Sequence, residues 1–196
     1  YQGIRKSAVA SLFTFISTLH SLCDSPAWVP GDTNGVQLDP NVEKIAQVIM
    51  PAIMETWEAE DDRTAAIEIC QSFASCLNKC GPGLISPQWI EPTCQLTLQI
   101  LEKKAPSQID PEADEDEETE DSSEYESVLI SAAMDLVGAM AYVLCDSFMT
   151  PMRQFLPLLC KYYSPGRSVT DRATAIGSLG EITVNMKRAI TPFTQD

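Results

Sequence analysis

The sequence predicts an all-α protein in which helical hairpins stack side by side. The first observation is a repeated pattern of one small residue followed by three larger, mostly apolar residues at intervals of four, three and four. This spacing places the four side chains on one stripe of a helix. The pattern occurs four times: Ala8-Leu12-Phe15-Leu19, Ala66-Cys70-Phe73-Leu77, Ala133-Val137-Met140-Leu144 and Ala175-Leu179-Ile182-Met186. Internal repetition of this kind is typical of solenoid architectures.

The second observation is that a proline sits inside each of three apolar-periodic segments, at Pro51, Pro92 and Pro157. A proline in a helix interior removes one backbone hydrogen bond and bends the helix, which suits the curved first helix of a hairpin. Once the polar insertions are set aside, the repeat shortens to the spacing between Ala133 and Ala175, about 42 residues, which is within the range of HEAT repeats. The sequence therefore predicts an α-solenoid of HEAT repeats.

Composition supports this fold class. The chain has 196 residues, of which 44% are hydrophobic, enough for a continuous core. No segment shows sustained period-two alternation, and no apolar run reaches the ~18 residues of a membrane span. We expect a single array over residues 1–196, because each hairpin needs its neighbours to bury its apolar face.

Seven helices are predicted in order, each bounded by turn residues such as Gly81-Pro82-Gly83 and Ser164-Pro165-Gly166. They cover residues 2–23, 41–58, 62–80, 86–104, 124–145, 148–163 and 168–187. Residues 1–23 form the second helix of a hairpin whose first helix is missing, and three complete repeats follow over 41–80, 86–145 and 148–187. The middle repeat carries an insertion at 105–124. We interpret the chain as a fragment of a longer solenoid.

The insertion is intensely acidic. Between residues 110 and 126 there are 11 acidic residues and no basic residue, in a chain whose net charge is −15. Such a run repels itself and favours a basic partner, whereas it repels the phosphates of nucleic acid. The acidic loop comprises Asp114, Glu115, Asp116, Glu117, Glu118, Glu120 and Asp121. The alternative is a solvated insertion that contributes only to solubility.

The outer faces of the second helices form a second candidate surface. In solenoids the second helices usually line the concave side, where extended partners bind. Carboxylates beside an aromatic ring suit a peptide that carries lysine or arginine, through charge-assisted hydrogen bonds and cation–π contact. The candidate cargo-binding residues are Glu68, Ser75, Asp135, Tyr142, Asp146 and Glu181. An ordinary solvated face is the alternative. On the first helix, Phe13 is expected to point outward, towards a neighbouring repeat.

The sequence gives no support for catalysis, a cofactor or a metal site. There is one histidine, His20, and no glycine-rich loop that would cradle a phosphate. Of the seven cysteines, Cys76 and Cys80 lie one helical turn apart, but there is no compact Cys-x-x-Cys pair to complete a zinc site. We expect reduced thiols in the core of a cytosolic or nuclear protein.

Two stretches resemble a known family. These are Ser123-Glu124-Tyr125-Glu126-Ser127-Val128-Leu129 after the acidic run, and Asp171-Arg172-Ala173-Thr174-Ala175-Ile176-Gly177-Ser178-Leu179-Gly180-Glu181-Ile182. They are similar to the importin-β (karyopherin) superfamily of nuclear import receptors, and within it to the importin-4 type. The resemblance implies a non-enzymatic receptor that shuttles between cytoplasm and nucleus through the nuclear pore. It implies basic cargo such as core histones and ribosomal proteins.

The resemblance further implies that Ran-GTP and phenylalanine-glycine nucleoporins bind the full-length receptor, and we do not expect those contacts in this segment. Direct binding to nucleic acid or membrane is not expected. Together these observations predict a cargo-binding segment of a nuclear transport receptor. A HEAT-repeat scaffold for a multi-subunit complex, an acidic histone-chaperone-like module, and a structural spacer are the alternatives.

Overall fold

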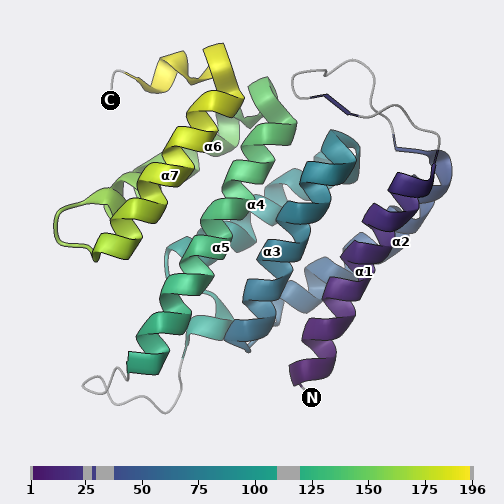
Figure 1. Ribbon diagram of the computed structural model, residues 1–196, viewed down its shortest axis with the longest axis horizontal. Helices are drawn as coiled ribbons and strands as arrows, with labels where there is room; N and C mark the ends of the chain where they lie inside the picture. The colour runs from purple at the N-terminus through teal and green to yellow at the C-terminus, as the bar shows by residue number, and fades with distance from the viewer. Residues whose placement is uncertain (1, 24–27, 30–37, 110–119, 195–196) are drawn as a thin grey trace.

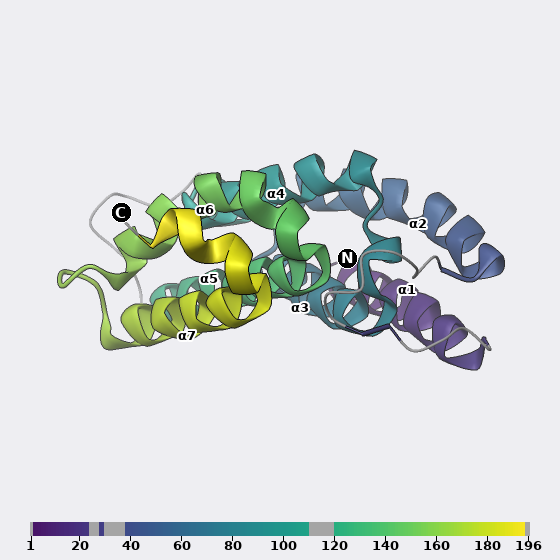
Figure 2. The ribbon, with the colours of Figure 1, turned by 90° about the horizontal axis from the view of Figure 1, so that it is seen from above.

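The helices are arranged in two layers, as the computed structural model shows (Figures 1 and 2). It describes residues 2–23, 28–29, 38–109 and 120–194. The helices are α1 (Gln2–Leu22), α2 (Pro40–Glu58), α3 (Arg63–Cys80), α4 (Pro87–Leu101), α5 (Glu120–Leu144), α6 (Met149–Tyr163) and α7 (Val169–Met186). In Figure 2, α2, α4 and α6 form one layer and α1, α3, α5 and α7 the other. This stack of helical hairpins confirms the predicted all-α solenoid of HEAT repeats.

In the layer of α1, α3, α5 and α7, each helix packs against the corresponding helices of the preceding and the following repeat. The α3 helix lies between α1 and α5, and α5 lies between α3 and α7. Contacts of α4 with α5 and of α6 with α7 join the two layers. The rings of Trp57 on α2 and Phe73 on α3 also meet edge to face, with centroids 6.5 Å apart. We call the layer of α1, α3, α5 and α7 the inner layer.

Local sequence explains where the helices begin and end. The Asp62 carboxylate accepts a hydrogen bond from the Ala65 backbone N–H at 2.8 Å, and the Ser168 hydroxyl accepts one from Asp171 at 3.0 Å. These side chains satisfy donors that the first helical turn leaves unpaired. At its other end, α3 stops at Gly81, whose φ of 71° favours glycine. Prolines lie inside α2, α4 and α6, as predicted.

The predicted apolar stripe forms the core in three helices of the inner layer. In α3 and α5 all four members are buried, and in α7 only Leu179 is partly exposed. The prediction is wrong for α1. There Ala8 is exposed and Phe15 is 53% exposed, whereas Val9, Phe13 and Ile16 are buried.

The reason lies in how α1 meets α3. The Phe13 ring stacks on that of Phe73 with centroids 5.0 Å apart, so Phe13 is 1% exposed and does not point outward. The apolar residues of α1 form two neighbouring stripes, and either could face the core. Contact with α3 decides which stripe is buried, and the buried stripe contains Phe13.

The most apolar segment runs through α5 and α6. Contrary to the sequence-based expectation, residues Glu124–Tyr163 include a window that is apolar and long enough to cross a membrane by composition alone. In the folded chain 78% of that window is buried among the other helices. Its composition therefore matches a central core helix, with α3 on one side and α7 on the other.

The two ends of the acidic insertion are fixed to the helical stack. Ala105 and Ser107 are buried, and the Gln108 side-chain amide donates to the Ile100 carbonyl at 3.0 Å and to the Glu126 carboxylate at 2.9 Å. The α5 helix begins at Glu120, earlier than predicted. Glu120 and Asp121 therefore belong to a helix, while Asp114, Glu115, Asp116, Glu117 and Glu118 lie outside the described residues.

Arginines near the starts of inner-layer helices tie neighbouring segments together. Arg5 donates to the carboxylates of Glu60 at 2.8 Å and Asp61 at 2.7 Å. Arg63 donates to the Ser107 carbonyl at 3.1 Å, which holds the start of the insertion against α3. The stack thus presents its inner layer as one continuous surface.

Candidate functional site

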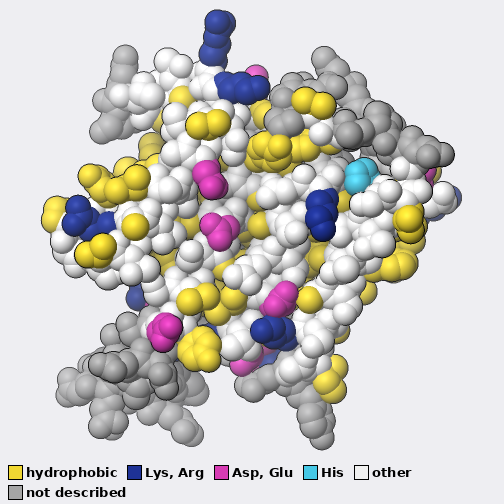
Figure 3. All heavy atoms as spheres, viewed as in Figure 1, with side chains coloured by type: hydrophobic (Ala, Val, Ile, Leu, Met, Phe, Trp, Pro, Cys, Tyr) yellow, Lys and Arg dark blue, Asp and Glu magenta, His cyan; other side chains and the backbone are white. Residues whose placement is uncertain are grey.

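A groove of about 890 Å³ opens on the surface of the inner layer, between α3, α5 and α7. Figure 3 shows this face, with acidic side chains near its middle, between α5 and α7. The groove is lined by Ala74, Asn78, Asp135, Gly138, Ala139, Tyr142, Ile176, Gly177, Gly180, Glu181, Val184 and Asn185. We call it the carboxylate groove.

Helical periodicity brings these residues together. On α5, Asp135, Ala139 and Tyr142 follow one another at intervals of four and three, so they share one stripe. On α3, Ala74 and Asn78 are one turn apart. The buried stripes of these helices face the core, and the groove residues therefore face outward from the same helices.

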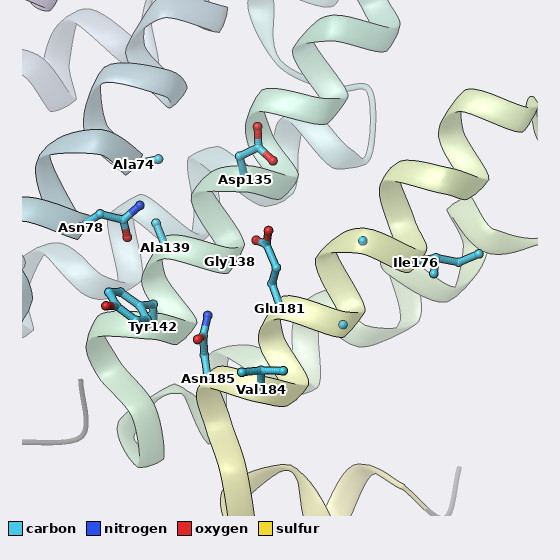
Figure 4. Close-up of a pocket in the computed structure, with 12 residues that line it drawn as sticks. Ala74, Asn78, Asp135, Gly138, Ala139, Tyr142, Ile176, Glu181, Val184 and Asn185 are labelled. Carbon is cyan, nitrogen blue, oxygen red and sulfur yellow. The ribbon is translucent and has the colours of Figure 1, made fainter. Parts of the chain in front are cut away.

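Two carboxylates line the groove close to one another. Figure 4 shows the Glu181 side chain extending from α7 towards α5, where Asp135 projects from the facing side of the groove. Gly138 allows this approach, because a Cβ at that position would lie only 3.0 Å from the Oε2 atom of Glu181. Desolvation by burial, followed by the nearby negative charge of Glu181, raises the pKa of Asp135.

The carboxylate pair has no cationic partner among the residues that the structure describes. Among the ion pairs formed by the described residues, none involves Asp135 or Glu181. Two carboxylates that repel one another without a counter-ion are a favourable environment for an ammonium or guanidinium group, which forms charge-assisted hydrogen bonds with them. The groove is therefore chemically suited to a lysine or arginine side chain.

An aromatic ring marks the other end of the groove. Tyr142 is partly buried, and its ring meets that of Trp28 edge to face at 4.9 Å, with an angle of 86° between the ring planes. Trp28 in turn lies against Gly81, where a Cβ would come within 2.7 Å of its ring. Trp28, from the connection between α1 and α2, thus contacts both the end of α3 and the ring that lines the groove.

Three of the six candidate cargo-binding residues lie in one groove. Asp135, Tyr142 and Glu181 line the carboxylate groove. Glu68 and Ser75 line a separate groove of about 250 Å³ between α1 and α3. Asp146 is exposed in the short turn after α5 and lines neither groove.

The separated Glu68 already has partners. Its carboxylate accepts a hydrogen bond from the Ser72 hydroxyl at 2.8 Å and lies 3.8 Å from the Lys6 ammonium. These contacts partly neutralise it. Glu68 is consequently less available to a basic ligand than the pair at Asp135 and Glu181.

Sequence reasoning missed Asn78 and Asn185. Both side chains lie beside the groove in Figure 4, where amides supply donors and acceptors to a peptide backbone. Each follows a groove residue by four positions, Ala74 on α3 and Glu181 on α7. Extending the rows of outward-facing residues by one helical turn would have found them.

The cysteine pair on α3 is part of the core. The sulfur atoms of Cys76 and Cys80 are 3.9 Å apart, and both residues are buried. The neighbouring Cys80 sulfur, together with burial, raises the pKa of the Cys76 thiol. Within the described ranges, no group of three or more potential ligands is placed to hold a metal ion.

The amino-acid sequence is similar to those of three proteins that are named as importins. The chain is 32% identical over 204 aligned residues to the probable importin subunit beta-4 of Schizosaccharomyces pombe, and the match covers 100% of this chain and 19% of that protein. The chain belongs to the importin-β family. It is also similar to importin-4 of Homo sapiens, at 27% identity over 97% of the chain, and to importin-4 of Mus musculus, at 26% over 98%. The chain spans less than a fifth of the length of these relatives. No protein-family model matches it.

Proposed function

We propose that this chain is a cargo-binding segment of a nuclear transport receptor that imports basic proteins. Core histones and ribosomal proteins are the proposed cargo. The observation that carries the proposal is the pair of carboxylates, Asp135 and Glu181, which both line the groove and take part in none of the ion pairs among the described residues. The names of the relatives, importin subunit beta-4 and importin-4, support transport rather than catalysis.

The proposed mode of binding is electrostatic. A basic, extended cargo segment lies along the inner layer, with one lysine or arginine between Asp135 and Glu181 and its stem against Tyr142. The net charge of −15 accelerates the encounter with a basic partner and opposes direct binding to nucleic acid. Affinity is therefore expected to fall steeply with salt.

The acidic run acts on a different part of the same cargo. Residues 110–119 of the run precede α5, which begins at Glu120, and fifteen residues of helix separate Glu120 from Asp135, about 22 Å at a rise of ~1.5 Å per residue. The run therefore raises the local concentration of a basic segment and shields that segment from nucleic acid, while the groove binds one side chain in a defined place.

The remaining assignments concern the full-length receptor. It shuttles between cytoplasm and nucleus, and its contacts with Ran-GTP and phenylalanine-glycine nucleoporins lie outside this segment. Catalytic, metal and cofactor roles are not proposed for any residue here.

A binding titration tests the role of the carboxylate groove. A labelled histone-tail peptide is titrated with the wild-type chain and with the Asp135→Asn/Glu181→Gln variant, and the Kd is read by fluorescence anisotropy. We expect the neutral variant to bind about tenfold or more weakly at low salt, because each charge-assisted hydrogen bond contributes roughly 1.5–3 kcal/mol. The control is Glu55→Gln, which removes an exposed carboxylate from α2 in the other layer.

Equal affinities for wild type and the double variant would exclude the groove as the cargo site. If no basic peptide binds the chain at any salt concentration, the structural spacer becomes the better interpretation.

The acidic run is tested by replacing residues 110–119 with a glycine-serine linker of equal length. We expect weaker binding at low salt and a smaller dependence of log Kd on log salt, since fewer charges take part. An unchanged slope would leave the run with a role in solubility only.

A further inference from the structure

A second groove lies on the same face of the inner layer, near the start of α5. Its volume is about 470 Å³, and it is lined by Lys6, Thr64, Ile67, Gln71, Glu124, Tyr125 and Val128. Two of its apolar residues are exposed to solvent, Tyr125 by 50% and Val128 by 41%, while Ile67 packs partly on the core. We call Ile67, Tyr125 and Val128 the apolar patch.

The apolar patch and the carboxylate groove lie along the same sides of α3 and α5, and we call the two together the furrow. Val128 precedes Asp135 by seven residues on α5, and Ile67 precedes Ala74 by seven on α3. Seven residues make two turns, so each pair lies on one side of its helix, about 10.5 Å apart. Gln71 lines the patch and lies one helical turn from Ala74, which lines the carboxylate groove.

We propose that this furrow binds its basic segment at two points, a lysine or arginine at Asp135 and Glu181 and a large apolar side chain at the apolar patch. The apolar residue lies three or four positions from the basic residue in the bound segment. This inference rests on the proposed function and adds a specificity that net charge alone does not supply.

The spacing follows from the dimensions of extended chains. In a polyproline II conformation the third residue along points the same way after about 9.3 Å, at ~3.1 Å per residue. In a β-strand the fourth residue does so after about 13 Å. The patch extends from Val128 to Tyr125, which lie about 10.5 and 15 Å from Asp135 along α5. Both conformations therefore deliver a side chain to it.

The chemistry of the patch favours an apolar occupant over a second basic one. The Lys6 ammonium and the Glu124 carboxylate both line this groove, and Lys6 lies 3.8 Å from the Glu68 carboxylate, so the acidic groups there already have a cation beside them. Covering Tyr125 and Val128 removes exposed apolar area from water, which is favourable in proportion to that area. Because the apolar patch and the carboxylate groove lie along the same helices, one bound segment can contact both.

The test uses a series of labelled glycine-serine peptides, each with a block of three lysines and one leucine placed one to six residues from the block. Fluorescence anisotropy at low salt gives the Kd of each. We expect about fivefold or more tighter binding than that of a control peptide with serine in place of leucine when the leucine is one to four residues from the block, because it then lies three or four residues from one of the lysines. At five and six residues from the block no gain is expected. Equal affinity at all six spacings would overturn the proposal.

Two variants assign the effect to the patch. Val128→Ser and Tyr125→Ser are expected to abolish the preference for leucine at that spacing, while binding of the serine-only lysine peptide stays unchanged. Val48→Ser, at an exposed valine on α2, is the matched control and is expected to retain the preference.

The two proposals fail in different ways. If Asp135→Asn/Glu181→Gln weakens every peptide and the leucine never matters, the proposed function stands and the apolar contact is wrong. If the lysine block itself does not bind, both are overturned together.

Discussion

Asp135 illustrates how one side chain can serve binding at the expense of stability. It lies on the solvent side of α5, opposite Glu181, and folding raises its pKa through desolvation and the neighbouring negative charge. Functional sites often contain groups that are less stable in the folded protein than they would be elsewhere. The counter-charge that would relieve this pair is the one that a basic cargo would bring.

The first prediction concerns pH and Asp135. The unfolded carboxyl has a pKa near 3.8 and the folded one a higher value, so the folded state binds more protons between the two. The free energy of unfolding contributed by this group therefore falls as pH rises through that window. Asp135→Asn should raise the free energy of unfolding at pH 7 by about 0.5 kcal/mol, after allowance for solvent screening. Urea denaturation measures this, and the gain should vanish below pH 3.8.

The second prediction concerns the thiols. Burial raises the pKa of Cys70 and of Cys94 to about 12, whereas Cys160 is exposed on α6. Because the thiolate is the reactive form, iodoacetamide at pH 8 should modify Cys160 well before Cys70 and Cys94 in the folded protein. Mass mapping of tryptic peptides gives the order, with the denatured chain as control. Equally fast labelling of Cys70 would show that α3 opens readily.

At the scale of elements, neighbouring helices in both layers are joined by buried polar contacts as well as by apolar packing. The side chain of Glu60, before α3, is only 1% exposed, and it accepts hydrogen bonds from Arg5 at 2.8 Å and from the backbone N–H of Asp62 at 3.0 Å. The Tyr162 hydroxyl on α6 likewise donates to the Leu101 carbonyl at 2.8 Å, at the end of α4. Such contacts fix the register of neighbouring hairpins.

Removal of Arg5 tests this kind of contact. Arg5→Met should lower the free energy of unfolding by about 2–3 kcal/mol, because it leaves the buried Glu60 carboxylate without its cation. Lys6→Met is the control. The Lys6 ammonium lies 3.8 Å from Glu68, and both side chains are partly exposed, so its loss should cost under ~0.5 kcal/mol. Similar losses for the two variants would mean that the Arg5 contact is an ordinary surface ion pair.

The whole molecule combines a stack of hairpins with a strong excess of negative charge. The charge of −15 is spread unevenly, because 11 of the acidic residues lie between positions 110 and 126. Self-repulsion of this size destabilises the compact state, and salt screens it. The molecule is therefore expected to respond to ionic strength even without a partner.

A thermal unfolding series measures that response. Raising the salt concentration from low to about 0.5 M should increase the Tm of the wild-type chain, because the Debye length falls to a few ångströms. The variant with a neutral linker at residues 110–119 should show a smaller increase. A Tm that is independent of salt in both proteins would contradict the electrostatic account.

Much of this architecture could be predicted from sequence because the repeats carry the same apolar stripe. The stripes of α3, α5 and α7 and the turns at Gly81 and Pro165 needed no tertiary information. The stripe of α1 could not be predicted, since two stripes were available and only contact with α3 chose between them. For the groove, helical spacing identified Asp135, Tyr142 and Glu181. Helical spacing could not show that Glu68 lies in a different groove, because the way in which the helices pack side by side decides which outward-facing residues come together.

The packing of Trp28 against Gly81 limits which substitutions the chain can accept at these two positions. Any side chain at position 81 would collide with the indole ring, and the left-handed backbone there would add strain. The two positions can therefore change only in concert: a smaller residue at 28 is a precondition for losing the glycine. In an alignment of related sequences, covariation of positions 28 and 81 would mark this contact between two residues that lie far apart in the chain.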